Sequence, residues 1–191
     1  MEKSKLICVT NRHLANGSLY AQLVKIFKSC HKPDIVILRE KDMQEDEYKE
    51  LAVKVIRLCR DNCVACILHL FQDVAADTGA DGIHLPFSVF NQMPESKKKK
   101  FNIIGVSVHS REEAADAQKL GASYIIAGHI FQTGCKKGIA PRGLAFLNDI
   151  CSTVDIPVYA IGGIDMENAA SCIEAGAAGI CMMSGFMRME L

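Results

Sequence analysis

Three stretches of this chain repeat one pattern: TGADGIHL (residues 78–85), LGASYIIAG (120–128) and AGAAGICMM (175–183). In each, a glycine ends a helix-like segment, an alanine follows, and an apolar strand-like run begins. Glycine is the residue most often found just past the end of a helix. Repeated units of helix plus strand, each about 20–30 residues long, are typical of repetitive α/β folds. The pattern therefore predicts a (β/α)8 barrel, in which eight such units close into a ring.

Eight apolar runs of strand length support this prediction. They cover residues 5–10, 34–39, 63–69, 81–85, 102–108, 123–130, 156–161 and 178–183. Most are continuously apolar, as expected for parallel strands that are buried on both faces. A doubly wound open sheet is the alternative, but no Gly-x-Gly-x-x-Gly motif follows the first run. We therefore expect one TIM-barrel domain over residues 1–191, with helices that begin after Ser18 and Ser110, two good N-cap residues.

The last unit looks incomplete. After the eighth run only SGFMRMEL (184–191) remains, which is too short for a full covering helix. The 191 residues are also fewer than the roughly 250 that are usual for this fold. We expect the eighth helix to be short or missing, so that Phe186, Met187 and Met189 add to an exposed apolar surface. Surfaces of that kind commonly mark interfaces, which predicts a homo-oligomer.

The composition excludes some classes of function. Lysine plus arginine and aspartate plus glutamate each number 22, so the net charge is zero and the basic surplus of a nucleic-acid binder is missing. Neither a secretory signal nor a segment of transmembrane length is visible, which predicts no membrane partner and a cytoplasmic location. The cysteine count of nine is odd, and the Cys63-x-x-Cys66 pair has no second pair to complete a metal site. We interpret these thiols as core residues.

The polar residues at the predicted strand ends indicate a ligand site, because TIM barrels carry their active sites there. Small residues follow the seventh and eighth runs, and they allow backbone N–H groups to approach a phosphate closely. The predicted phosphate-binding residues are Gly162, Gly163, Ser184 and Gly185, assisted by Lys136 or Lys137. The alternative is that the glycines serve only tight turns. Four other residues at this rim are predicted to contact the substrate. They are Arg39 and Lys41 at the end of the second run, and Ser107 and His109 at the end of the fifth run.

Four of the six histidines also map to the predicted rim, and His129 has the strongest claim to chemistry. It follows Gly128 at the end of a strand and leads into a long basic loop, and imidazole can take up and release a proton near neutral pH. His84, between Ile83 and Leu85, could instead be a satisfied core histidine. We expect no metal, because no His-x-His motif opens the first strand and carboxylates are scarce at the other strand ends.

Several motifs together resemble the thiamine phosphate synthase superfamily. They are VILREKD (36–42), GADGIHL (79–85), GVSVHSREEA (105–114), GASYIIAGHIF (121–131), PVYAIGGI (157–164) and GICMMSG (179–185), in order along nearly the whole chain. The superfamily has two enzymatic branches. Synthases, which are transferases, join a pyrimidine pyrophosphate to a thiazole phosphate with magnesium. The TenI-type thiazole tautomerases, which are isomerases, aromatise a thiazole carboxylate phosphate by moving a proton.

The chain departs from the synthase pattern where that pattern binds magnesium. Where synthases have an Asn-Asp pair after the third strand, this chain has His69-Leu70. A later aspartate of the synthases corresponds to about Val89, and a glutamine of their second strand corresponds to Ile37. In contrast, GHIFQTGCKKG (128–138) is similar to the tautomerase branch, and this resemblance implies that His129 transfers the proton. The expected function is thus thiazole tautomerase, without a cofactor, acting on a phosphorylated thiazole whose carboxylate meets Arg39 or Lys41. Thiamine phosphate synthase, with magnesium, and a non-catalytic phosphate-binding or regulatory module remain the alternatives.

Overall fold

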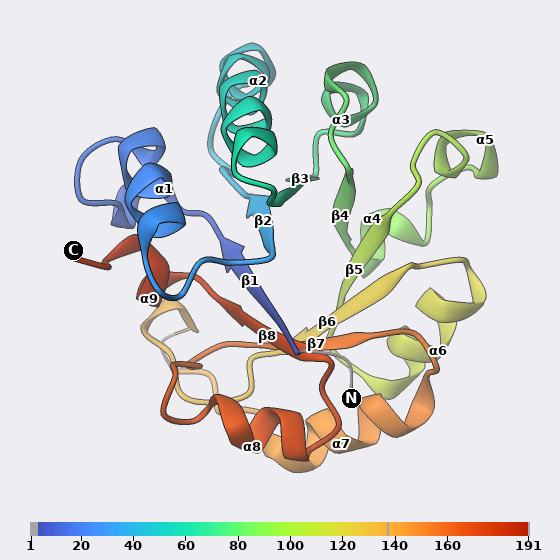
Figure 1. Cartoon of the computed structure of the whole chain (residues 1–191). Coiled ribbons are helices and arrows are strands. Elements are labelled where there is room, and N and C mark those ends of the chain that lie inside the picture. Colours follow the sequence, from blue (N-terminus) through green and yellow to red (C-terminus); the bar gives the residue numbers. More distant parts are fainter. Residues whose placement is uncertain (1–3, 137, 191) are drawn as a thin grey trace.

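The computed structural model describes residues 4–136 and 138–190, and it confirms the predicted (β/α)8 fold. Eight parallel strands close into a barrel in chain order, with β1 paired to both β2 and β8 (Figure 1). The strands are β1 (Lys5–Val9), β2 (Ile35–Leu38), β3 (Ala65–His69), β4 (Gly82–Pro86), β5 (Ile104–Val108), β6 (Tyr124–Gly128), β7 (Val158–Ile161) and β8 (Gly179–Met182). Each lies within a predicted apolar run or extends one residue beyond it.

Helices surround the barrel on its outside (Figure 1). They are α1 (Leu19–Lys28), α2 (Glu45–Asp61), α3 (Gln72–Thr78), α4 (Phe87–Phe90), α5 (Glu95–Lys98), α6 (Arg111–Lys119), α7 (Gly143–Thr153), α8 (Ala169–Glu174) and α9 (Ser184–Met187), with 3₁₀ turns η1 (Arg12–Leu14) and η2 (Gly134–Lys136). Ser18 and Ser110 cap α1 and α6 through their hydroxyls, as predicted. No described helix is long and apolar enough to cross a membrane.

Apolar side chains fill two separate regions. The larger cluster lies between the strands and the helices. The smaller one fills the inside of the barrel and consists of Ile7, Val9, Ile37, Ile67, Tyr124, Ile126, Tyr159 and Cys181. Gly105 makes room for the ring of Tyr124, which a Cβ at that position would overlap. The barrel interior is therefore a packed floor beneath its open end.

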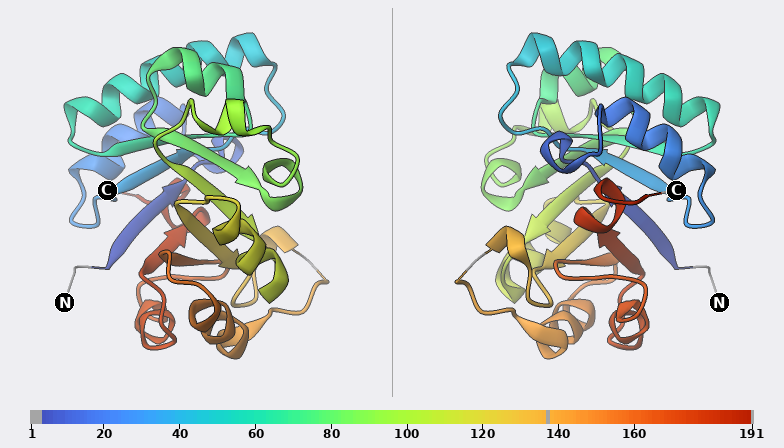
Figure 2. Two further views of the ribbon diagram at one scale, coloured as in Figure 1. Left: turned by 90° about the vertical axis from the view of Figure 1, so that its right-hand side faces the viewer. Right: turned by 90° about the vertical axis from the view of Figure 1, so that its left-hand side faces the viewer.

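The chain after β8 is short, as expected, but it does not leave the barrel wall bare. Helix α9 has four residues, and the side chains of Phe186 and Met187 are fully buried. The side-chain amide of Gln22 in α1 donates to the carbonyls of Phe186 (2.9 Å) and Met189 (3.0 Å). Figure 2 shows α9 beside α1, which it contacts. The prediction that Phe186, Met187 and Met189 form an exposed patch was wrong, because they cover the wall themselves.

The Cys63-x-x-Cys66 pair divides between two environments. Cys66 lies in β3 and is buried, so the prediction of a core thiol is confirmed for it. Cys63 is exposed in the turn before that strand, with φ 54°, and the prediction was wrong there. The two residues therefore do not act as one structural unit.

Candidate active site

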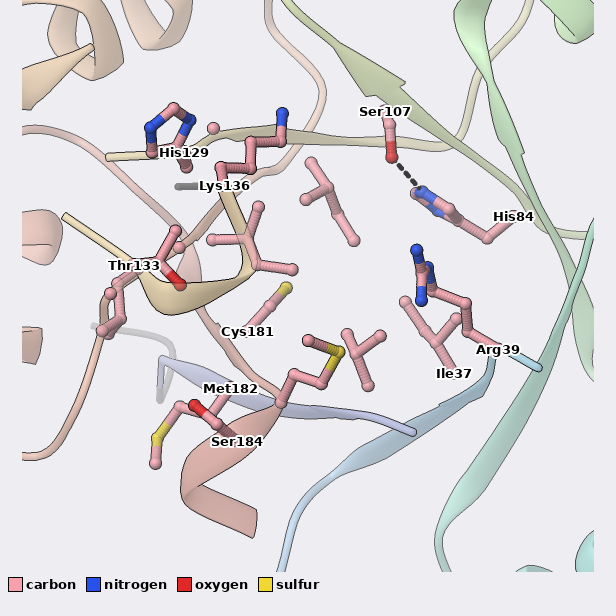
Figure 3. A pocket seen from close by; sticks show the side chains of 18 of the residues that line it. Ile37, Arg39, His84, Ser107, His129, Thr133, Lys136, Cys181, Met182 and Ser184 are labelled. Carbon is pink, nitrogen blue, oxygen red and sulfur yellow. Dashed lines mark hydrogen bonds between the residues drawn. The ribbon is translucent and has the colours of Figure 1, made fainter. Parts of the chain in front are cut away.

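A cavity of about 300 Å³ opens where the carboxyl ends of the strands meet (Figure 3). The predicted site residues that line it are Arg39, Lys41, Ser107, His109, His129, Lys136, Gly162, Gly163 and Ser184. Gly185 is not among the lining residues, and Lys137 lies outside the described residues. The cavity floor is apolar and includes Val9, Ile37, Ile126 and Cys181. This arrangement suits a ligand with a flat apolar body and polar ends.

The two glycines after β7 bring its loop against the loop after β6. Gly162 has φ +102°, and a Cβ there would overlap the Cβ of His129. Gly163 has φ +66°, and its Cβ would overlap the carbonyl of Gln132. The N–H of Phe131 donates to the carbonyl of Gly162 at 2.9 Å. Both positions therefore need glycine for the turn and for close packing, whether or not their N–H groups also bind a phosphate.

The cavity is lined by cations and, among the described residues, by no carboxylate. Arg39, Lys41 and Lys136 all contribute to its wall. Partial burial, together with the neighbouring charges of Arg39 and Lys136, lowers the pKa of Lys41. The three charges thus lie close enough to repel one another, and an anionic ligand would relieve that repulsion.

His84 lies at the centre of a buried polar network on one side of the cavity. Its Nε2 is 2.7 Å from the Ser107 hydroxyl, and its Nδ1 is 3.2 Å from the Tyr124 hydroxyl. Its ring stacks between those of His69 and Tyr124, with centroids 6.0 and 5.6 Å away. Both ring nitrogens of His84 therefore have partners, as expected from the sequence for a satisfied core histidine. His84 nevertheless also lines the cavity. The sequence predicted no role for His69 or Tyr124. For His69 the signal was its position at a strand end, which it shares with the other histidines of the rim.

His69 and His84 are both neutral at neutral pH. Burial lowers the pKa of His84 to about 3, with smaller contributions from His69 and Arg39. Burial also lowers the pKa of His69 to about 3, with contributions from Arg39 and Lys41. They can donate or accept a hydrogen bond through their neutral rings, but they add no positive charge to the cavity.

His129 lies across the cavity from Arg39 and His84, on the side of Lys136 (Figure 3). Its side chain is buried, with 4% of the residue exposed. Its Nε2 is 3.3 Å from the carbonyl of Ile139, which can only accept, so Nε2 carries the ring proton. Its Nδ1 has almost no accessible surface and no hydrogen-bond partner among the described residues. Imidazole is the most common general acid or base, so His129 at the cavity wall is the candidate for proton transfer.

The residues present do not fit a magnesium ion. Magnesium prefers oxygen ligands, most often carboxylates together with substrate phosphates. The described lining offers hydroxyls, imidazoles and cations. Leu70 and Val89, the positions that resemble the synthase ligands, carry no oxygen in their side chains, and Val89 packs against the apolar core. The site therefore lacks the donors that would hold a divalent cation against a pyrophosphate.

Comparison with known proteins places the chain in a family. A family model described as thiamine monophosphate synthase matches residues 6–186. A putative thiamine-phosphate synthase 2 from Aquifex aeolicus is 36% identical over 98% of this chain and 100% of that protein. A thiamine-phosphate synthase from Clostridium acetobutylicum is 37% identical over 97% of this chain and 88% of its own length. The solved structure of a thiamine phosphate pyrophosphorylase from Pyrococcus furiosus superposes with a TM-score of 0.83, at 32% identity, over 97% of this chain and 88% of that one. The chain therefore belongs to the thiamine monophosphate synthase family.

Proposed function

We propose that this protein is a thiazole tautomerase of thiamine biosynthesis, an isomerase that aromatises a thiazole carboxylate phosphate by proton transfer through His129. The observation that carries the proposal is a cavity whose described lining combines three cations with the imidazole of His129 and has no carboxylate. A cytoplasmic biosynthetic enzyme with small phosphorylated substrates is in keeping with the family.

The charges of the cavity match those of the proposed substrate. A phosphate monoester carries about −1.5 to −2 charges at pH 7, and a carboxylate adds one more. In our proposal the phosphate lies between the loops after β7 and β8, held by backbone N–H groups of Gly162, Gly163 and Ser184 and by Lys136. The carboxylate lies toward Arg39 and Lys41 on the opposite wall, with Ser107 and His109 beside the ring.

The chemistry requires one group that can both remove and return a proton. In the proposed step, the imidazole of His129 removes a proton from a ring carbon, and the electron pair of that C–H bond enters the ring system. The imidazolium then returns the proton to the second carbon, so the product has the same atoms and charge as the substrate. Arg39, near the carboxylate, would stabilise the negative charge that develops between the two steps.

Thiamine phosphate synthase is the second candidate, because the similar proteins from A. aeolicus and C. acetobutylicum bear that name. That reaction joins two substrates with magnesium, for which the described lining offers no carboxylate. A non-catalytic phosphate-binding module is the third candidate. Assaying each reaction separately, with magnesium and with a chelator, distinguishes the three. We expect isomerisation that survives chelation; synthase turnover that needs magnesium would overturn the proposal.

The variant His129→Asn tests the proposed catalytic residue. Asparagine keeps the approximate size of histidine but cannot cycle a proton, so turnover should fall by roughly 10² to 10⁴. Affinity for the phosphorylated thiazole and the melting temperature should change little, because the anion contacts other residues. The matched control is His31→Asn, at an exposed histidine outside the cavity. A well-folded His129→Asn protein with nearly normal turnover would remove His129 from the mechanism.

A further inference from the structure

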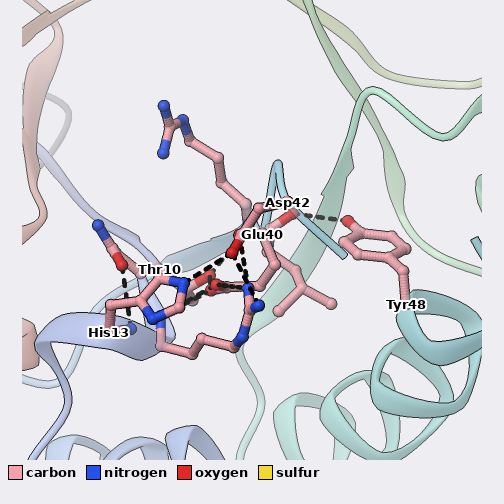
Figure 4. Close-up of polar contacts among 9 residues, drawn as sticks. Thr10, His13, Glu40, Asp42 and Tyr48 are labelled. Carbon is pink, nitrogen blue, oxygen red and sulfur yellow. Dashed lines mark hydrogen bonds and ion pairs between the residues drawn. The ribbon is translucent and has the colours of Figure 1, made fainter. Parts of the chain in front are cut away.

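Two carboxylates follow β2 directly beside the cationic cavity, yet neither lines it. Successive side chains alternate along residues 39–42: Arg39 and Lys41 line the cavity, whereas Glu40 and Asp42 contact the loop between β1 and α1 (Figure 4). Opposite charges on adjacent residues would normally be free to pair. Here the structure separates them, with cations on one side of the chain and anions on the other.

Glu40 is buried and fully engaged on the side away from the cavity. Only 2% of the residue is exposed. Its carboxylate accepts from the Thr10 hydroxyl at 2.7 Å and from the N–H of Arg12 at 3.1 and 3.0 Å, one distance for each oxygen. The Arg12 guanidinium adds a contact at 3.4 Å. A buried carboxylate is strongly unfavourable unless it is paired and hydrogen-bonded in this way, so this conformation of Glu40 is strongly preferred.

The Thr10 hydroxyl connects Glu40 to the backbone of Arg39. It donates to the Glu40 carboxylate and accepts from the N–H of Arg39 at 2.9 Å. Thr10 is itself fully buried, and its own N–H donates to the carbonyl of Ile37 at 3.0 Å. The chain at the end of β2 is thus fixed at two successive residues by the hydroxyl of Thr10, the residue that follows β1.

Asp42 makes a second, more exposed set of contacts. The Arg12 guanidinium donates to it at 2.6 and 2.9 Å, and Nε2 of His13 lies 2.8 Å away. Arg12 and His13 hold the pKa of the Asp42 carboxyl well below its usual range. Because exposed ion pairs contribute little free energy, we regard Thr10 and Glu40 as the main restraint. Both carboxylates are nevertheless engaged by Thr10, Arg12 and His13.

We propose that Thr10 and Glu40 are positioning residues that hold Arg39 and Lys41 in the cavity and thereby set its affinity for the anionic substrate. This inference rests on the proposed function, because it assigns the cavity an anionic ligand. A restraint is needed because the cations gathered there repel one another and Lys41 loses part of its hydration. Without the restraint, their long side chains would gain freedom in solvent, and the released carboxylates could compete with the ligand.

The test measures binding of the thiazole carboxylate phosphate by calorimetry at constant ionic strength, together with KM and kcat, because in our proposal its carboxylate meets Arg39 and Lys41. Thr10→Val keeps the shape of the side chain but removes the hydroxyl, whereas Thr10→Ser keeps the hydroxyl. We expect Thr10→Val to weaken binding of this ligand and raise KM by about 10-fold, with a smaller change in kcat. Thr10→Ser should restore binding to within about two-fold of the unmodified protein.

Glu40→Gln provides a second variant, for which the direction of the change in anion affinity distinguishes two explanations. If Glu40 acted only through its charge, its neutralisation would strengthen anion binding. Positioning predicts the opposite, because the NH2 group of glutamine would replace the carboxylate oxygen that accepts from the Arg12 N–H and guanidinium, and an NH2 group cannot accept. Asp77→Asn, at an exposed ion pair with Lys49, is the control for loss of one negative charge. Weaker binding of the thiazole carboxylate phosphate by Glu40→Gln, without a matching change in Asp77→Asn, supports the inference.

The outcomes separate this inference from the proposed function. If the unmodified protein binds the thiazole carboxylate phosphate and folded Thr10→Val or Glu40→Gln binds it equally well or better, the positioning role is overturned and the anion site stands. If the unmodified protein does not bind this ligand, the anion site is overturned and the positioning role with it. If one of the two variants does not fold, binding by the other variant decides the question by the same criterion. If neither variant folds, the inference is overturned, and Thr10 and Glu40 serve stability alone.

Discussion

Acidification from pH 6 to pH 4 should destabilise this protein through the two buried histidines of the cavity. Burial holds the pKa of His69 and of His84 at about 3 in the folded state, against about 6.5 in an unfolded chain. Between these values the unfolded state binds protons that the folded state does not. The free energy of unfolding therefore decreases as the pH falls through this window, and it is fully retained above pH 6.5.

The size of the effect follows from the two shifts. Each histidine should reduce the free energy of unfolding by about 1.4 kcal/mol per pH unit once its unfolded form is protonated. From pH 6 to pH 4 this amounts to about 2.5 kcal/mol per histidine, because the unfolded form is already mostly protonated at pH 6. Both ring nitrogens of His84 already face hydroxyl oxygens, which can accept from an imidazolium. Burial, and not missing hydrogen bonds, therefore opposes protonation.

Urea unfolding followed by circular dichroism at pH 4, 5 and 6 measures this dependence. The double variant His69→Gln/His84→Gln should lose most of the slope, and each single variant about half of it. His31→Gln, at an exposed histidine, serves as the matched control. If the double variant keeps the slope of the unmodified protein, the two histidines are not the groups responsible and their burial does not govern their protonation.

Two further predictions concern the loop after β7 and the association state. Gly162→Ala should reduce stability by about 1–3 kcal/mol and impair turnover, because its Cβ would displace His129. Gly17→Ala has a similar φ, +91°, with open space around it, so it should keep full turnover; equal turnover of both variants would refute the argument. The homo-oligomer was predicted at the barrel wall after β8. Because Phe186 and Met187 are buried there, we instead expect its interface at Met166, before α8, and Ile173, in α8, which are 50% and 37% exposed beside a second cavity of about 370 Å³. Sedimentation should show dissociation by Ile173→Lys, and a monomeric unmodified protein at micromolar concentration would contradict it.

The fold could be predicted from the sequence because its signals are local. Continuous apolar runs identify parallel strands, since both faces of each strand are buried. Ser18 and Ser110 act within one helical turn, and Gly79, Gly121 and Gly176 all have the positive φ expected at helix ends. Because parallel strands place their carboxyl ends on one rim, the rim position of His129 and Arg39 also followed from the order of the segments.

The contacts within the site depended on the tertiary structure. Residue pairs such as Thr10 with Glu40 and His84 with Tyr124 are 30 and 40 residues apart, so no local pattern relates them. The stagger of the strands brings them together when the barrel closes. The same closure places Glu40 away from the cavity while Arg39 faces it, and it leaves Gly185 outside the lining. It also buries Phe186 and Met187 against the wall that the short last unit was expected to expose, because apolar side chains fill the space that a longer helix would occupy.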